Sequence, residues 1–191
     1  MSLVGATQHR HLTAKRAAAL LDQVAPTGAP AVIRWQLAGE LVADVRHLEQ
    51  QIAAVEARIK TAVAQANTSL VGLFGVGPVL AARFLGEVGD IGRFPTKHHF
   101  AAHTGTAPLE ASSGQVIRHR LSRAGDRKLN HALYMMAMVQ VRRPSAGQAY
   151  YRRKLAEGKS PKEALRCLKR RLSDAVYRCL LADRRYPAVT G

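Results

Sequence analysis

Apolar residues repeat with helical spacing through the first third of the chain. From about Val32 to Ala66 they alternate steps of four and three residues, at Leu41, Val45, Leu48, Ile52, Val55, Ile59 and Ala62. The positions between them are polar, at Arg46, Glu49, Gln50, Glu56 and Lys60. This heptad pattern predicts a long amphipathic helix that forms a coiled coil or a helical hairpin. It fits equally an oligomerisation arm or a helix packed on its own domain.

Further helices are predicted on both sides of this one. A first helix from Thr13 to about Val24 ends at a turn rich in proline and glycine, residues 25–30. A later helix runs from Asp126 to Arg142, before Pro144, and the last from Ser160 to about Leu181. The last helix opens with a capping box, in which Ser160 stands at the N-cap, Pro161 in the first turn and Glu163 three residues after the serine.

The hydrophobic faces of the two later helices predict a core. In the helix over residues 126–142 the inward positions are Leu129, Leu133, Met136, Ala137 and Val141. In the last helix they are Leu165, Leu168, Leu172, Val176 and Leu180, and the basic residues Arg166, Lys169, Arg170, Arg171 and Arg178 are expected around the remaining surface.

The fold class predicted from these patterns is mainly α. Eight glycines between residues 72 and 114 punctuate short apolar pieces, which is typical of short helices joined by tight turns. The only strand signal is a short hairpin near Gly114. We expect a helical coiled-coil arm over residues 1–69, a compact helical domain over residues 70–185, and a tail over residues 186–191.

The net charge of the chain and its distribution indicate the kind of partner that the protein binds. The chain carries 29 Lys and Arg against 13 Asp and Glu, a net charge of +16. Residues 1–69 carry a net charge of +2, whereas residues 70–191, with 22 basic and 8 acidic side chains, carry +14. A solvated basic surface or a ribosome-associated protein would share this charge, but it favours a polyanionic partner, and nucleic acid foremost.

Other classes of protein find little support in the sequence. No apolar stretch of membrane-spanning length occurs, and residues 1–10 lack the apolar core of a signal peptide. Cys167 and Cys179 match no metal or redox motif, which favours reduced, buried thiols. The adjacent His98 and His99, with His103 one helical turn later, favour surface or phosphate contacts over a metal site. No metal site is predicted.

The segment Leu73–Ala81 resembles a helix-hairpin-helix DNA-binding motif. Gly75 and Gly77 flank Val76, and a helix follows. The glycines permit a tight turn, and the free amides at the start of the second helix can hold a phosphate. Such contacts position DNA without reading its sequence. The alternative is a plain tight turn between packed helices. Phe74 stands where proline is common in this motif.

Paired serines before a glycine form a second candidate. Ser112 and Ser113 precede Gly114, upstream of a run of basic residues: Arg118, His119, Arg120, Arg123, Arg127 and Lys128. Arginines can hold the oxygens of a phosphodiester while a serine attacks it. From the residues alone an ordinary loop is the better interpretation. Tyr150 and Tyr151, beside basic residues 152–154, form either a base-stacking patch or a helix closing onto the core.

A series of short motifs, in order over roughly residues 70–182, resembles one known domain. The motifs are Leu73–Ala81, residues 89–95 (GDIGRFP), 104–108 (TGTAP), 112–114 (SSG), 118–122 (RHRLS), 125–130 (GDRKLN) and 165–171 (LRCLKRR). They resemble the C-terminal domain of the insertion-sequence 110/116/902 transposases, also called DEDD transposases. The helical stretch before them is similar to the coiled coil of that family.

The resemblance implies a site-specific recombinase that acts on DNA. Family members place a serine nucleophile in this domain, which falls on Ser113 here, and a structured bridge RNA pairs with target and donor DNA. Mg²⁺ is expected only with the family's resolvase-like domain, which carries an Asp-Glu-Asp-Asp set, so we expect no cofactor within this chain. The DNA-binding residues that we select are Gly75, Val76, Gly77, Arg118, Arg120, Arg123, Arg127 and Lys128. A homo-oligomer or a full-length transposase is the expected protein partner, and a bacterial cytoplasmic, nucleoid-associated location follows.

The sequence departs from the family pattern before Thr13, where we find no room for a resolvase-like domain. A late start, a decayed copy of the element, or a deliberately partial protein would each explain this. We therefore expect either a recombinase fragment that needs carboxylates supplied elsewhere, a non-catalytic nucleic-acid-binding regulator, or an inert remnant.

Overall fold

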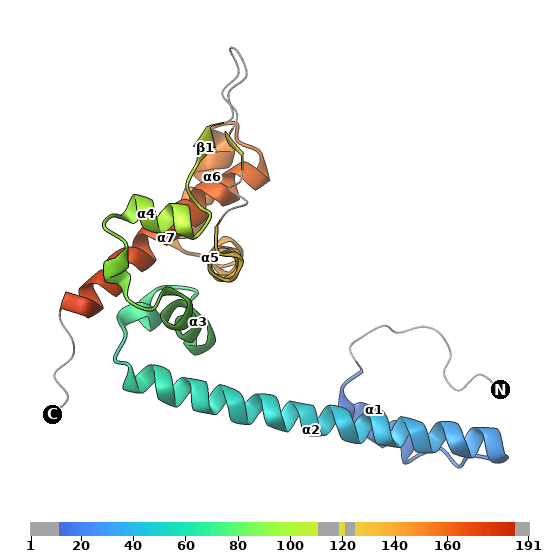
Figure 1. Cartoon of the computed structure of the whole chain (residues 1–191). Helices are drawn as coiled ribbons and strands as arrows, with labels where there is room; N and C mark the ends of the chain where they lie inside the picture. Colours follow the sequence, from blue (N-terminus) through green and yellow to red (C-terminus); the bar gives the residue numbers. More distant parts are fainter. Residues whose placement is uncertain (1–11, 111–118, 121–124, 186–191) are drawn as a thin grey trace. The chain divides into compact units, whose positions relative to one another are not determined.

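The computed structural model describes residues 12–110, 119–120 and 125–185 (Figure 1). Within them the protein is helical, with α1 (Ala14–Leu21), α2 (Ala29–Gln65), α3 (Pro78–Val88), α4 (Lys97–His103), α5 (Arg127–Arg142), α6 (Ala146–Ala156) and α7 (Pro161–Arg185). Two short 3-10 helices are η1 (Ser69–Gly72) and η2 (Ile91–Arg93). None of these helices is both long and apolar enough to cross a membrane. The predicted mainly α fold is confirmed.

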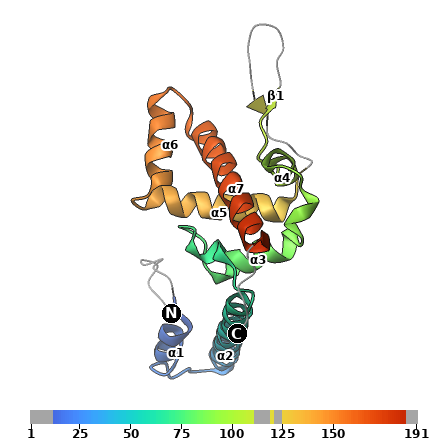
Figure 2. The ribbon, with the colours of Figure 1, turned by 90° about the vertical axis from the view of Figure 1, so that its left-hand side faces the viewer.

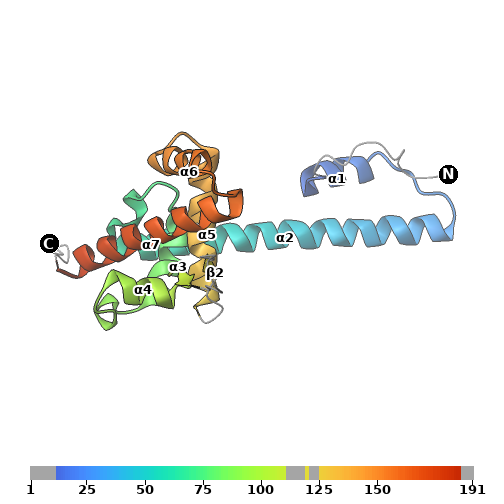
Figure 3. The same ribbon diagram turned by 90° about the horizontal axis from the view of Figure 1, so that it is seen from above.

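The chain divides into two compact units, with the boundary inside α2 after Ala57. In the first unit α1 folds back beside the first part of α2 (Figures 2 and 3). The hydroxyl of Thr13 caps α1 by accepting from the amide of Arg16 at 3.3 Å. The indole Nε1 of Trp35 donates to the carbonyl of Leu21 at 3.0 Å and ties the two helices together.

Helix α2 keeps most of its apolar stripe exposed. The side chains of Leu41, Val45, Leu48, Ile52 and Val55 are between 45% and 65% exposed. Farther along the stripe the burial changes, because Ile59 is partly buried against the core of the second unit and Val63 is buried in it. The long helix that the heptad pattern predicts from about Val32 to Ala66 is confirmed by α2.

Helix α7 is the central element of the second unit. It contacts α4, α5, α6, η1 and η2, and Figure 2 shows it running across α5 with α6 and α4 to either side. Its inward residues Leu168, Leu172, Val176 and Leu180 are all buried, as predicted, whereas Leu165 is only partly buried. On α5, Leu129, Leu133, Met136 and Ala137 are buried and Val141 packs against the cluster. These faces meet and form the core that the sequence predicts.

Aromatic rings close the end of this core that lies near α4. The rings of Phe94 and Phe100 meet edge to face, with centroids 5.3 Å apart. Tyr177 of α7 packs on Phe100 and donates its hydroxyl hydrogen to the carbonyl of Phe94 at 3.1 Å. Thr104 and Ser173, both fully buried, satisfy each other at 3.2 Å between their hydroxyl oxygens. Helices α4 and α7 are thus joined by both packing and hydrogen bonds.

The predicted helix ends agree with the structure to within a few residues. The capping box is confirmed, since Glu163 Oε2 accepts from the backbone nitrogen of Ser160 at 3.0 Å and from its hydroxyl at 2.6 Å. The prediction stopped α7 four residues early and set out no separate helix for α6. Two paired segments, β1 (Leu109–Glu110) and β2 (His119–Arg120), flank the position of the predicted hairpin near Gly114.

Candidate nucleic-acid interface

The segment Leu73–Gly77 forms a tight turn between η1 and α3. Gly75 adopts a positive φ of 90°, and a Cβ there would lie 3.1 Å from the carbonyl oxygen of Met136 in α5. Both facts require glycine, because an L side chain would be strained and would press on the backbone of α5. Val76 is buried at 6% exposure, and the carbonyl of Phe74 accepts from Nε2 of Gln140 at 2.7 Å. The turn is therefore seated on α5, and Val76, selected as a DNA contact, is a core residue.

Gly77 serves a different purpose from Gly75. It is the N-cap of α3, it makes no side-chain capping bond, and a Cβ there would meet nothing within 4 Å. Pro78 follows as the first residue of the helix, and the next amides in the first turn have no acceptor inside the helix. The backbone at the start of α3 is thus open to an approaching acceptor, as the hairpin interpretation requires.

Basic side chains of α3 and α5 lie close to one another on this part of the domain. The guanidinium of Arg83 is 3.3 Å from Nδ1 of His131, and Lys128 pairs with Glu87 at 2.9 Å. The hydrogen bond to Glu87 raises the pKa of Lys128. Arg127, the first residue of α5, is exposed. Arg127 and Lys128 are both predicted DNA contacts. Lys128 already has a carboxylate partner, whereas Arg127 is exposed to solvent.

Described residues on either side of the Ser113 segment (residues 111–118) contact one another, and these contacts are called the root of that segment. Leu109 is the partner of Arg120, and Glu110 of His119, in the antiparallel pair β1–β2. The backbones of Gly105 and Gly125 are also in close contact, since a Cβ on Gly125 would lie 2.4 Å from Cα of Gly105. A glycine is required there by this close approach of two backbones.

Three hydrogen bonds from the start of α5 hold the same root. The amide of Asp126 donates to the carbonyl of His103 at 2.7 Å. Asn130 donates through Nδ2 to the carbonyls of Thr104 and Gly105, at 2.8 and 3.1 Å. The carboxylate of Asp126 also caps α5 at Leu129. The start of α5 therefore holds residues 103–105, which lead into β1.

The candidate residues of that segment itself lie outside the described part of the chain. These are Ser113, Arg118 and Arg123; Arg120 is described only as a backbone position in β2. Their assignments stay predictions.

One functional candidate was missed, because it was expected on the surface. Lys169 of α7 is buried, at 8% exposure, and its ammonium donates to Oδ1 of Asn130. Burial lowers the pKa of Lys169. A polar residue at that position of an amphipathic helix carries no signal of burial, since only the packing of α5 against α7 encloses it.

Among the described residues, the aromatic and histidine candidates Tyr150, His98 and His103 lie beside basic side chains. Tyr150 packs against the core, and the cations of Arg153, Lys154 and Arg171 lie within 5.6 Å of its ring centroid. It therefore has both the core packing of one predicted interpretation and the basic surroundings of the other. His98 lies against Arg170 and His103 against Arg93. In the described ranges no group of three or more His, Cys, Asp or Glu side chains could hold a metal ion.

Comparison with known proteins assigns the region. Residues 67–152 match the family described as Transposase IS116/IS110/IS902. The chain is 36% identical to the IS116 44.8 kDa protein of Streptomyces clavuligerus over 58% of its own length and 28% of that protein. It is 33% identical to the IS110 43.6 kDa protein of Streptomyces coelicolor (81% and 38%) and 31% identical to the IS900 42 kDa protein of Mycobacterium paratuberculosis (92% and 48%).

The chain spans less than half the length of each of these insertion-element proteins. The matched region contains the Gly75–Gly77 turn and the root of the Ser113 segment. The chain therefore belongs to the IS116/IS110/IS902 transposase family, and it contains the C-terminal region of that family.

Proposed function

We propose that this chain binds DNA during transposition of an insertion element and contributes Ser113 as the nucleophile of strand transfer. The observation that carries the proposal is the positive charge of the chain from residue 70 onward. Residues 70–191 hold a net charge of +14, and the α3 hairpin in that region offers open backbone amides. Cations neutralise phosphates and release counterions, so this charge favours binding of any nucleic acid of sufficient length.

The hairpin can be tested with a matched pair of glycine substitutions. Gly77→Val fills the open space at the start of α3, where a phosphate would approach, and we expect affinity for a DNA duplex to fall about tenfold. Gly72→Val, in the neighbouring η1, also enters open space and serves as the control. Fluorescence anisotropy of a labelled duplex measures both. Equal affinities for the two variants would contradict a phosphate contact at the hairpin.

In the proposed chemistry the Ser113 hydroxyl attacks a backbone phosphorus of the DNA. The serine gives its proton to solvent, and a bond forms between the serine oxygen and phosphorus. The bond from phosphorus to one sugar oxygen breaks, and that oxygen takes a proton from solvent as it leaves as a hydroxyl group. The broken strand then stays covalently attached to the protein. Neighbouring arginines would hold the phosphate oxygens. Within the described residues no group of three or more His, Cys, Asp or Glu side chains could hold Mg²⁺.

The nucleophile can be tested by trapping the covalent adduct. The purified chain is incubated with donor DNA, Mg²⁺, RNA and a full-length family member, then denatured and digested for mass spectrometry. We expect a nucleotide-modified peptide containing Ser113 in the wild type and in Ser112→Ala, and none in Ser113→Ala. An adduct that persists in Ser113→Ala would overturn the assignment.

A second candidate function is non-catalytic binding, as a regulator of a transposase. It is favoured by the hairpin, whose contacts need no nucleophile. In that case Ser113→Ala would bind nucleic acid unchanged, no adduct would form in any variant, and the chain would suppress transposition in cells.

The exposed stripe of α2 supports self-association or association with a full-length transposase. A helix with Leu41, Leu48 and Ile52 about half exposed is stabilised when a second helix covers that seam. We expect Leu48→Glu to lower the mass measured by sedimentation equilibrium, while Gln50→Glu, at a polar position of the same helix, leaves it unchanged. A monomeric wild type would contradict this part of the proposal.

A further inference from the structure

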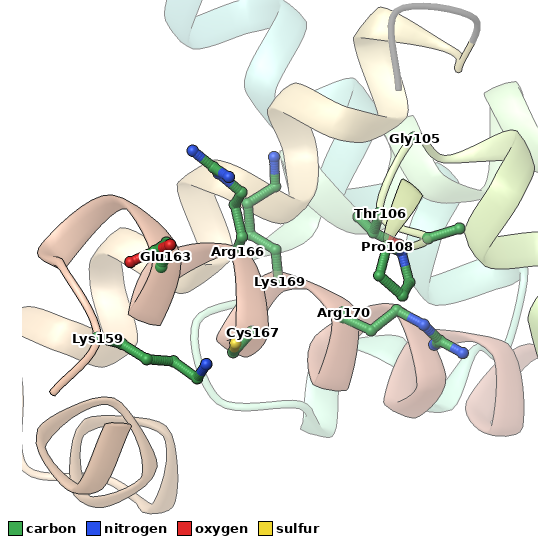
Figure 4. Close-up of a pocket in the computed structure, with 10 residues that line it drawn as sticks. Gly105, Thr106, Pro108, Lys159, Glu163, Arg166, Cys167, Lys169 and Arg170 are labelled. Atoms are coloured by element: carbon green, nitrogen blue, oxygen red, sulfur yellow. The ribbon is translucent and has the colours of Figure 1, made fainter. Parts of the chain in front are cut away.

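A cavity of about 250 Å³ opens between α7 and the loop that leads into β1. The loop contributes Gly105, Thr106, Ala107 and Pro108, and the first half of α7 with its preceding linker contributes Lys159, Glu163, Arg166, Cys167, Lys169 and Arg170. In Figure 4 Arg166 and Lys169 extend from α7 towards the same side, and Thr106 and Pro108 approach from the loop. The cavity therefore lies at the root of the segment that contains Ser113.

The lining of this cavity is strongly basic. It holds four cationic side chains and one carboxylate. That carboxylate, Glu163, is already used by the capping box, where its Oε2 accepts two hydrogen bonds from Ser160. The hydrogen bonds from Ser160 lower the pKa of Glu163, which keeps it charged. Arg170 pairs with Asp174 of its own helix. Even with Asp174 counted, cationic side chains outnumber carboxylates at this cavity.

Lys169 is the member of the lining whose surroundings are most unusual. Its ammonium is buried, and within the described residues its partner is the neutral amide oxygen of Asn130, with no carboxylate at ion-pair distance. A buried cation without a counterion is costly, and folding proteins normally pair or neutralise such a group. The cost is offset when an anion enters the cavity and accepts from the ammonium.

Asn130 connects this ammonium to the root of the Ser113 segment. Its Oδ1 accepts from Lys169, and its Nδ2 donates to the carbonyls of Thr104 and Gly105. An anion held at Lys169 would therefore be held at a defined position relative to the start of β1. The size of the cavity also suits a phosphate, because a phosphodiester group with its adjoining sugar atoms occupies less than the volume available.

We propose that this cavity binds a backbone phosphate of a nucleic acid, with Lys169 as its buried ligand and Lys159 and Arg166 at its rim. The inference rests on the proposed function, because it assigns one place on the domain where the polyanion is held. The phosphodiester is common to DNA and RNA, so the chemistry alone does not choose between them, and the experiment has an arm for each.

The two cysteines make a direct test. Cys167 lines the cavity, whereas Cys179 lies on a later turn of α7 with its thiol 2.9 Å from the hydroxyl of Ser69. Iodoacetamide alkylation of both thiols is followed by mass spectrometry in the absence and presence of a short DNA duplex or a hairpin RNA. We expect the nucleic acid that enters the cavity to slow alkylation of Cys167 severalfold and to leave Cys179 unchanged.

Substitutions complete the test on the same protein. Lys169→Met removes the charge but keeps the length of the side chain, and we expect about tenfold to hundredfold weaker binding with a salt slope shallower by about one. Arg178→Met, an exposed position on the same helix, is the control and should change affinity less. Thermal unfolding of each variant identifies any that fails to fold, and Arg166→Gln, on the exposed rim, then replaces it.

The outcomes separate the two levels of the proposal. Nucleic acid that binds the wild type without protecting Cys167, and with equal affinity for Lys169→Met, overturns the cavity as a phosphate site and leaves the proposed function standing. A wild type that binds neither DNA nor RNA overturns both. Protection by only one of the two nucleic acids identifies the source of the phosphate.

Discussion

Helices α2 and α7 have similar patterns of apolar and polar residues in the sequence, but the burial of their apolar residues differs in the structure. Both are long, 37 and 25 residues, and both carry an apolar stripe between charged positions. On α7 the stripe residues Leu168 and Val176 are fully buried, whereas on α2 Leu41 and Leu48 are 65% and 55% exposed. The difference shows that periodicity predicts a helix and its apolar face, whereas the elements packed around the helix decide whether that face is covered.

Neighbouring segments explain the difference. Helix α7 is packed against α4, α5 and α6. Among the described residues the short α1 lies beside the first part of α2, and the hydrogen bond from Trp35 to the carbonyl of Leu21 joins the two helices. The second unit is therefore stabilised by its own core. For α2 we expect that another chain covers the exposed apolar side chains and thereby stabilises the helix.

The largest expected effect comes from removing a core side chain of α7. Leu168→Ala deletes a fully buried leucine and should lower the free energy of unfolding by about 2–5 kcal/mol. Leu48→Ala, the same change on the exposed stripe of α2, should cost about 0.5 kcal/mol or less in dilute protein. Urea unfolding at low concentration measures both. Equal losses would show that α2 is covered within its own chain.

The next effect concerns the seat of the hairpin on α5. Gly75→Ala must adopt a positive φ and approach the carbonyl of Met136, so we expect a loss of about 1–2 kcal/mol in stability. Gly72→Ala enters open space and is the control. Thermal unfolding compares them, and a neutral Gly75→Ala would show that the turn does not require a left-handed residue.

A smaller effect is expected at the junction of α1 and α2. Trp35→Phe removes the indole donor and leaves the Leu21 carbonyl to solvent, at a cost of about 1 kcal/mol or less. Hydrogen exchange should accelerate in α1 and stay unchanged in α5 to α7, because the two units pack separately. Faster exchange throughout the second unit would contradict this separation.

The smallest effect is a pH dependence from Lys169. Burial lowers its pKa below the unfolded value of 10.5, so the unfolded chain binds more protons as pH approaches that value. The contribution of Lys169 to the free energy of unfolding should therefore rise between neutral pH and pH 10.5, where the folded ammonium loses its proton first. The difference between wild type and Lys169→Met, measured by urea unfolding at both pH values, isolates this contribution. A difference independent of pH would show that the ammonium stays as well solvated as in the unfolded chain.

The sequence by itself determined helices α1, α2, α5 and α7, the capping box of Ser160 and Glu163, and the inward faces of α5 and α7. These depend on local spacing and capping, which a linear pattern contains. It also located the tight turn at Gly75–Gly77 and the concentration of positive charge after residue 70.

Only the tertiary structure decided which of these residues come together. The contact of Gly105 with Gly125, the burial of Lys169 and its bond to Asn130 join positions that are far apart in the chain. It also separated two glycines that look alike in sequence, because Gly75 packs on α5 while Gly77 stays open. Such differences arise from the packing of α5 and α7, since enclosure of a side chain depends on all the elements around it and on no single periodic pattern.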